Sequence, residues 1–313
     1  MLAIVIPYYK LTFFEVTLKS LAIQTDLRFK VYIGDDASSE DCSVLLERYK
    51  QRIDLVYHRF NSNLGSVSLT QQWERCIALT EDEKWFMLLG DDDILEHNLV
   101  EEFYNCINSS TKEIDLIRFN LRVIDQDGKL KSESFDHKIH ETTEELLDQM
   151  LVMKETISAS EFVFSRKIYE HNNGFMEYPL GWFSDYATWL VFSKSNGIYY
   201  VKNSTVYWRL STINISSVVS DVKTMQLKIK SLFLFMYFVQ VNFNIDQKRL
   251  KQYTHSQIIN FFGNISDFIK IGILRKECFK SKFKLTEIII IEFIFRRMKR
   301  KKIKNLWKYL FRN

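Results

Sequence analysis

The sequence contains little proline and glycine, and its cysteines form no paired motif. Two prolines and nine glycines among 313 residues argue against long flexible linkers and low-complexity segments. The four cysteines are scattered and include no C-x-x-C pair, which argues against a disulfide scaffold or a cysteine zinc site. We therefore expect reduced, buried thiols at Cys42, Cys76, Cys106 and Cys278.

Several motifs and targeting signals are also absent. The six histidines show no H-E-x-x-H spacing, and neither G-x-x-x-x-G-K-[ST] nor G-x-G-x-x-G occurs, which disfavours a zinc enzyme or a P-loop protein. The N-terminus lacks a basic region and a cleavage site, so we expect no signal peptide and a cytoplasmic location. In the C-terminal region the longest uncharged stretch, residues 231–245, contains three amides and falls short of the ~20 apolar residues of a membrane span.

Charge is distributed unevenly along the chain. Residues 296–313 contain nine Lys or Arg and no acid; subtracting these from the net charge of +4 leaves the other residues at −5. Within 285–313 an apolar, aromatic stretch is followed by a basic run and then by aromatic residues among basic ones, which suits an interfacial helix in peripheral contact with an anionic membrane. The alternative is a helix packed on the protein with a solvated basic face. We expect no nucleic-acid partner, because the body is acidic and no nucleic-acid motif occurs.

The N-terminal third alternates between apolar runs and amphipathic segments. We expect strands over residues 2–9, 29–36, 53–60 and 84–92, each followed by a segment whose apolar residues recur at helical spacing. This alternation predicts an α/β fold, a mostly parallel Rossmann-like sheet with helices on both faces. In such sheets, ligands bind at the carboxyl ends of the strands.

Polar side chains follow three of these strands. The segments are IPYYK after the first strand, GDDASSED after the second and GDDDIL after the fourth. The adjacent carboxylates of Asp91, Asp92 and Asp93 repel one another, and Mn²⁺ or Mg²⁺ would neutralise them while bridging to phosphate oxygens. The alternative is that these acids cap the following helices.

The ordered set AIVIPYYK, VYIGDDASSEDC, NSNLGSVSLTQQW and WFMLLGDDDIL resembles the family 2 glycosyltransferases, which have the GT-A fold. The resemblance covers roughly residues 1–215. It implies an inverting, metal-dependent enzyme that moves a sugar from a nucleotide-sugar donor, expected to be a UDP-sugar, to a glycan or lipid-linked acceptor. The setting it implies is bacterial surface polysaccharide synthesis, with the protein peripheral on the inner face of the cell membrane.

The resemblance also implies roles for individual residues. Asp93 is expected to bind the metal, with Asp91 or Asp92 reaching the metal or the ribose hydroxyls; Asp91 is taken as the second metal ligand, and the division of roles among the three aspartates is left open. Asp36 matches the residue that binds the base, and its neighbour Asp35 is the alternative. The residues expected to contact the donor nucleotide are Pro7, Tyr9, Asp35, Asp36, Asp91, Asp92 and Arg209. Tyr8 is expected either at this turn or in the core, and the loop over residues 61–66 is either a simple turn or a donor contact.

Inversion by direct displacement requires a general base beside the acceptor hydroxyl. The segment GWFSDYATWLVF places Asp185 in the first turn of a predicted helix, and it resembles the family's catalytic acid-x-aspartate motif with Ser184 at the first acid. The alternative is a carboxylate that only complements the helix dipole. Arg209 matches an arginine that a histidine follows in many relatives, and no histidine follows here. It is expected to bind the diphosphate or to neutralise a nearby carboxylate.

We expect a catalytic domain over residues 1–220 and a helical C-terminal appendage over 221–313. Within the catalytic domain, a donor half is expected over about 1–115 and an acceptor half over about 116–220. Two other functions remain open. A nucleotidyltransferase normally has a glycine- and arginine-rich loop that IPYYKLTFF lacks, whereas a non-catalytic member of the fold would not need the retained aspartates. The donor sugar, the linkage and a homo-oligomeric state are left open.

Overall fold

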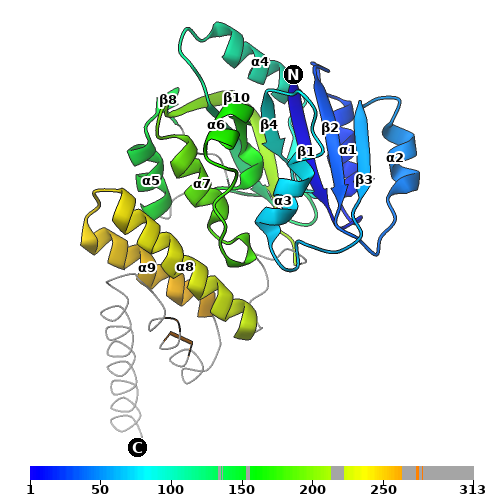
Figure 1. Ribbon diagram of the computed structural model, residues 1–313. Coiled ribbons are helices and arrows are strands. Elements are labelled where there is room, and N and C mark those ends of the chain that lie inside the picture. The colour runs from blue at the N-terminus through cyan, green and yellow to red at the C-terminus, as the bar shows by residue number, and fades with distance from the viewer. Residues whose placement is uncertain are drawn as a thin grey trace, which may run out of the picture. The chain divides into compact units, whose positions relative to one another are not determined.

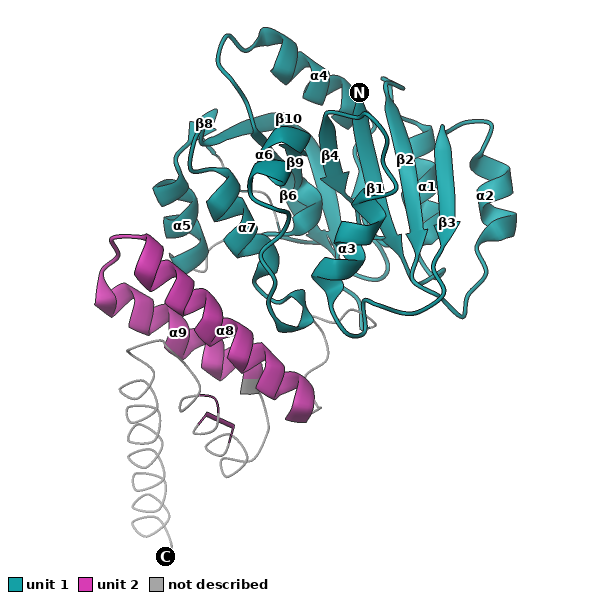
Figure 2. Ribbon diagram, in the orientation of Figure 1, with its two compact units in different colours: residues 1–217 teal, residues 218–313 magenta. Residues whose placement is uncertain are grey.

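The computed structural model divides the chain into two compact units, Met1–Ser217 and Val218–Asn313 (Figure 2). It describes residues 1–132, 135, 137–152, 156–212, 222–262, 273, 274 and 277. Cys278 and the basic segment 285–313 lie outside the described residues. The predicted division of the first unit into a donor half and an acceptor half stays a prediction.

The first unit is built on a mixed β-sheet (Figure 1). Its strands are β1 (Leu2–Tyr8), β2 (Phe29–Asp35), β3 (Leu55–Arg59), β4 (Trp85–Leu88), β5 (Ile94–Leu95), β6 (Leu116–Ile124), β7 (Leu130–Ser132), β8 (His140–Glu141), β9 (Phe162–Ser165) and β10 (Ile198–Arg209). Among the described residues the strand order is β3-β2-β1-β4-β9-β6-β10-β5, with β7 beside β6 and β8 beside β10.

The helices of this unit mostly connect successive strands. They are α1 (Phe14–Ala22), α2 (Ser43–Tyr49), α3 (Leu69–Ile77), α4 (Leu99–Ser109), α5 (Thr143–Val152), α6 (Arg166–His171) and α7 (Ser184–Phe192), with short 3₁₀ turns η1 (Ala159–Glu161) and η2 (Pro179–Gly181). The expected α/β architecture is confirmed, and all four strands and four helices expected in the N-terminal third are present.

Strand direction brings several carboxyl ends to one edge of the sheet. β1 runs parallel to β2 and β4, and β3 runs parallel to β2. β9 is antiparallel to both β4 and β6, so β6 returns to the direction of β4, and β10 is parallel to β6. The residues that follow β1, β2, β4, β6 and β10 therefore share one edge.

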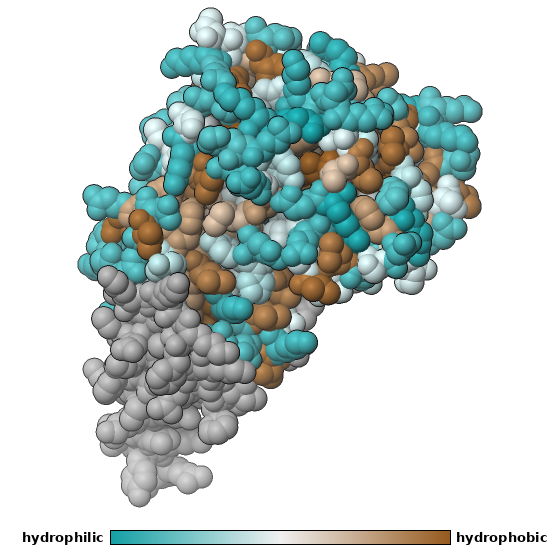
Figure 3. Space-filling model, in the orientation of Figure 1, coloured by the Kyte–Doolittle hydropathy of each residue, from teal (hydrophilic) through white to brown (hydrophobic). Residues whose placement is uncertain are grey.

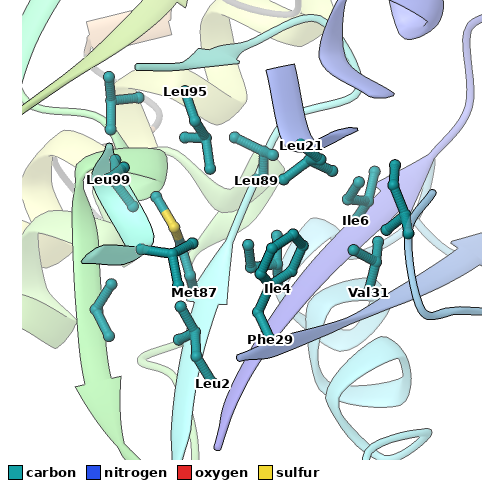
Figure 4. Packing of buried hydrophobic residues seen from close by; sticks show 14 of the residues in the cluster. Leu2, Ile4, Ile6, Leu21, Phe29, Val31, Met87, Leu89, Leu95 and Leu99 are labelled. Atoms are coloured by element: carbon teal, nitrogen blue, oxygen red, sulfur yellow. The ribbon is translucent and has the colours of Figure 1, made fainter. Parts of the chain in front are cut away.

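The core lies on both faces of this sheet. Leu2, Ile4 and Ile6 of β1 are buried in one cluster with Leu21 of α1 (Figure 4), and α2 and α4 contribute to the same cluster. Because side chains alternate along a strand, the intervening residues of β1 face the other side, where α3 contacts β1 and β2. α3, α6 and α7 lie in front of the sheet in Figure 1.

The second unit is helical as far as it is described, with α8 (Val222–Asn242) and α9 (Gln247–Phe262) in contact with each other. In the described part of the chain, no helix is both long and apolar enough to cross a membrane.

The cysteines and the surface complete the description. Cys42 and Cys76 are buried free thiols, and Cys106 is a partly buried one. On the face shown in Figure 3, hydrophobic residues are visible in separate patches among hydrophilic ones.

Candidate active site

The aspartate triplet after β4 lies against the turn after β1. Asp91 Oδ2 accepts hydrogen bonds from the backbone N–H groups of Tyr9 and Lys10, both at 2.7 Å. β1 and β4 are neighbouring parallel strands, shown side by side in Figure 1. The two strand ends thus meet, and Asp91 fixes the relative position of the two segments.

Asp93 is held inside the protein by both of its carboxylate oxygens. Its Oδ2 accepts from the Ser160 hydroxyl at 2.5 Å, and its Oδ1 accepts from the Arg209 backbone N–H at 3.0 Å. Burial raises the pKa of Asp93, and these two hydrogen bonds partly offset that rise. A Cβ on Gly90 would lie 2.8 Å from Asp93 Oδ2, so this turn requires a glycine.

Asp92 differs from its two neighbours. Among the described residues its carboxylate has no hydrogen-bond partner, and it is partly exposed. Burial raises the pKa of Asp92, and the charges of Asp93 and Asp91 raise it further, whereas Lys10 and Arg209 lower it. Burial also raises the pKa of Asp91. Negative charge on the triplet is therefore unfavourable in the surrounding protein alone, and a cation would stabilise the ionised carboxylates.

Within the described residues, no group of three or more His, Cys, Asp or Glu side chains could hold a metal ion. Mg²⁺ is commonly bound by one or two carboxylates, with water and substrate phosphates completing its coordination. The carboxylates of Asp92 and Asp93 could provide two such ligands. The triplet thus fits a cation that binds together with a phosphate ligand, and metal dependence stays a prediction.

Asp35 at the end of β2 is fully buried, and both of its carboxylate oxygens accept hydrogen bonds. Its Oδ1 accepts from the Ser38 backbone N–H at 2.8 Å, and its Oδ2 accepts from the Tyr57 hydroxyl at 2.5 Å and from Arg59 Nη1 at 2.7 Å. These contacts fix the turn that follows β2. A donor contact at Asp35 stays a prediction.

Asp36 holds the loop that precedes α3. Its oxygens accept from the backbone N–H groups of Leu64 at 2.7 Å and Gly65 at 2.9 Å, and Arg75 adds an ion pair. A Cβ on Gly65 would lie 2.6 Å from Asp36 Oδ2. A glycine at this position therefore allows the loop backbone to approach the Asp36 carboxylate closely. The loop over residues 61–66 is thus tied to Asp36, the residue predicted to bind the base.

The turn after β1 separates its two tyrosines. Tyr8 is fully buried and packs on Phe14, with ring centroids 4.7 Å apart, so it belongs to the core. Tyr9 is 42% exposed at the edge of the sheet. Pro7 pairs in register with Gly34 of β2 and is partly exposed. Pro7 and Tyr9 are therefore accessible beside the triplet, as a donor-binding role requires.

Arg209 ends β10 beside the triplet and is 3% exposed. Its guanidinium donates to the backbone carbonyls of Asp92 at 3.0 Å, Asp125 at 3.0 Å and Gln126 at 3.2 Å, and it lies over the Phe13 ring. These contacts lock the side chain between two strand ends. Its positive charge helps to neutralise Asp92, and a direct diphosphate contact stays a prediction.

Asp185 lies in the first turn of α7, as predicted. It is partly buried, and its Oδ1 accepts from the Tyr186 backbone N–H at 2.9 Å. No side chain among the described residues forms a hydrogen bond with its carboxylate. Burial raises its pKa to about 7. A carboxyl with a pKa near neutrality can accept and release a proton under physiological conditions.

The family model for Glycosyl transferase family 2 matches residues 3–171, over half of the chain. The chain belongs to glycosyl transferase family 2. Among proteins of curated function, no significant match was found.

Solved structures show the fold of this glycosyltransferase. The crystal structure of S. aureus TarS 1–349 in complex with UDP-GlcNAc is 14% identical, with a TM-score of 0.65 over 88% of this chain and 80% of that one. The structure of TarS 1–349 is 15% identical, with a TM-score of 0.63 over 93% and 88%. The chain spans 50% of the longer TarS structure, at 14% identity and a TM-score of 0.59. The GT-A fold expected from the sequence is confirmed.

Sequence reasoning missed one residue of the glycosyltransferase site, Ser160. Its hydroxyl bonds Asp93 and also accepts from the Gly90 backbone N–H at 3.2 Å. A local signal was present, because Ser158 and Glu161 form a capping box around η1, and S-x-x-E is recognisable in sequence. The signal predicts a rigid turn, but it does not reveal that this turn meets Asp93.

Proposed function

We propose that this family 2 glycosyltransferase transfers a sugar from a UDP-sugar to a hydroxyl of a glycan or lipid-linked acceptor, with inversion at the anomeric carbon. The observation that carries the proposal is Asp185, a helix-start carboxyl whose pKa burial raises to about 7. A second argument is the polar edge of the sheet around Asp91, Asp92 and Asp93, which suits a cation bound together with a diphosphate. The TarS structures with UDP-GlcNAc and with UDP support a uridine nucleotide as the donor group.

Asp185 acts as the general base in this proposal. Its carboxylate takes the proton of the acceptor hydroxyl while the acceptor oxygen forms a bond to the anomeric carbon. The bond from that carbon to the diphosphate oxygen breaks, and its electron pair leaves with the nucleotide diphosphate. Attack from the face opposite the leaving group produces inversion.

The departing diphosphate brings negative charge to the triplet. We propose that Asp92 and Asp93 hold Mn²⁺ or Mg²⁺, with Asp91, predicted as a ligand from the sequence, fixing the turn at Tyr9 instead. When bound, the ion supplies positive charge that stabilises the diphosphate. Ser160 and the Arg209 N–H keep Asp93 in one orientation, which removes the reorganisation that a free carboxylate would require.

The nucleoside is assigned to the turn after β1 and to the neighbouring end of β2. Tyr9 offers an exposed ring beside the triplet, and aromatic faces stack favourably on bases. Asp36 fixes the loop at Leu64 and Gly65. In this proposal a uracil lies between Tyr9 and the Asp36 turn, and Pro7 borders it.

We also propose a setting in bacterial surface polysaccharide synthesis, peripheral to the inner face of the cell membrane. The support is the combination of aromatic and basic residues within 285–313, which suits an anionic interface. Sedimentation with vesicles containing anionic lipid, compared with neutral vesicles, tests this part. Equal sedimentation with both vesicles contradicts it.

Calorimetric titration of UDP with and without Mn²⁺ tests the donor site. We expect Mn²⁺ to strengthen UDP binding, and Asp92→Asn to abolish that gain, since Asp92 has no internal partner to lose among the described residues. Asp185→Asn should bind UDP like the wild type yet transfer sugar from a panel of UDP-sugars roughly 10²-fold or more slowly. Failure to bind UDP, with binding of GDP, CMP or dTDP instead, contradicts the uridine assignment.

A further inference from the structure

Residues 173–183, named here the strap, connect α6 to α7 and run beside α3. η2 lies within the strap and contacts α3. A Cβ on Gly181 would lie 3.0 Å from Leu69 Cδ2 at the start of α3, and one on Gly174 would lie 2.2 Å from Glu74 Oε1 in its middle. The strap therefore packs closely on the helix that follows the loop 61–68.

Glu177 ties the middle of the strap to the start of α3. Its Oε1 accepts hydrogen bonds from Ser68 Oγ at 2.8 Å and from Gln71 Nε2 at 3.1 Å. Ser68 is the N-cap of α3, and its Oγ also accepts from the Gln71 backbone N–H at 3.2 Å. Glu177 thus binds the point where the loop beside Asp36 becomes a helix.

The residues before and after Glu177 in sequence form hydrogen bonds with α7 instead of α3. The Met176 backbone N–H donates to Thr188 Oγ1 at 3.0 Å, and the Tyr178 backbone N–H donates to Ser184 Oγ at 3.0 Å. Ser184 and Thr188 lie on either side of Asp185 in the first turns of α7. Three consecutive strap residues therefore connect the start of α3 to the helix turn that carries Asp185.

The backbone of the strap is strained, which shows that its contacts determine its path. Asn173, Leu180 and Phe183 have positive φ angles of 55°, 63° and 66°, and the two strap glycines are also left-handed. A left-handed conformation is unfavourable for residues that carry a Cβ, and more so for Leu180 and Phe183 than for Asn173. Such conformations persist where surrounding contacts over-determine the chain, and they cluster at functional sites.

We propose that Glu177 is a positioning residue that fixes the start of α7, and with it Asp185, relative to the donor-side loop 61–68. This inference rests on the proposed role of Asp185 as the general base. Glu177 contacts neither the aspartate triplet nor Asp36 among the described residues. Its loss therefore releases the strap from Ser68 and Gln71 without removing any group assigned to the nucleotide.

Glu177→Ala tests this role through two separate readouts. We expect kcat to fall by about tenfold or more, because small displacements of a catalytic group are costly, while the dissociation constant for UDP stays that of the wild type. Amide hydrogen exchange in the first turn of α7 should become faster. Glu177→Gln keeps an oxygen acceptor for Ser68 and Gln71, so it should restore both kcat and the exchange rates.

The matched control is Glu170→Ala, which removes an exposed glutamate of α6 that pairs with Arg166 at 3.6 Å. We expect this variant to have wild-type kcat and exchange rates. Exchange in α7 that is equal in the Glu177→Ala and Glu170→Ala variants overturns the inference, whatever the enzyme transfers. A wild-type protein that binds no nucleotide contradicts the proposed function instead, and the exchange measurement still decides on Glu177.

Discussion

At the scale of single residues, the carboxyl of Asp185 makes the folded protein sensitive to pH. Its pKa is about 7 in the folded protein and ~3.9 in an unfolded chain. Between these values the folded state keeps a proton that the unfolded state has released, so this group lowers stability as pH rises. We expect Asp185→Asn to raise the Tm above that of the wild type at pH 8 by more than at pH 4. An equal difference at both pH values contradicts the raised pKa.

The same carboxyl sets the pH dependence of catalysis. As a general base, Asp185 must be unprotonated, so kcat of the wild type should rise with pH through about 7. Asp185→Asn should lower kcat by roughly 10²-fold or more, the usual contribution of a general base. Initial rates of sugar transfer across a pH series measure both effects. Full activity of the variant would remove Asp185 from the mechanism.

Ser160 offers a prediction for the metal-binding edge. Ser160→Ala removes the hydroxyl that bonds Asp93 and accepts from the Gly90 N–H. We expect weaker UDP binding in the presence of Mn²⁺ and a stability loss of about 1–3 kcal/mol from the buried groups left unpaired. Calorimetry and chemical denaturation measure these two effects. Ser193→Ala is the control, because Ser193 is also buried and hydrogen-bonded but lies in another part of the unit; equal UDP affinities in the two variants contradict the prediction.

At the scale of elements, local patterns predicted the N-terminal strands and helices, because apolar runs and helical spacing are properties of neighbouring residues. The same patterns placed the aspartate triplet at the carboxyl end of a strand and Asp185 in the first turn of a helix. They did not reveal that β9 enters the sheet antiparallel between β4 and β6. They also missed Ser160 and Glu177, whose partners Asp93 and Ser68 are 67 and 109 residues away in sequence. Contacts of that range depend on tertiary structure.

The strap gives a prediction at the same scale. Gly174 and Gly128 both have positive φ, at 89° and 79°, but only Gly174 has a neighbour, Glu74, within reach of an added Cβ. Gly128→Ala should cost roughly 1–2 kcal/mol of stability from the left-handed backbone alone. Gly174→Ala should cost clearly more, because the Cβ also displaces Glu74. Thermal or chemical unfolding of both variants measures the difference, and equal losses contradict the close contact.

At the scale of the whole molecule, every residue assigned to the donor and to the base lies in the first unit. A chain of residues 1–217 should therefore unfold cooperatively and bind UDP with the affinity of the full chain, because a compact unit with its own core can fold alone. Circular dichroism and calorimetry measure these properties. A truncated protein that is folded but has lost UDP affinity would assign part of the donor site to residues 218–313.

The two anchors of Asp93 have a consequence for synthesis of the chain. Ser160 follows Asp93 by 67 residues and Arg209 follows it by 116. A ribosome that has just released the triplet still has to translate η1 before the first anchor exists and β10 before the second exists, at about 5–20 residues per second. For that interval the Asp93 carboxylate lacks both groups that hold it in the folded protein, whereas the Tyr9 and Lys10 N–H groups that bind Asp91 are already part of the chain. This edge of the sheet is therefore completed only after β10 has been translated, and a nascent chain that ends before β10 lacks the Arg209 N–H that holds Asp93 Oδ1.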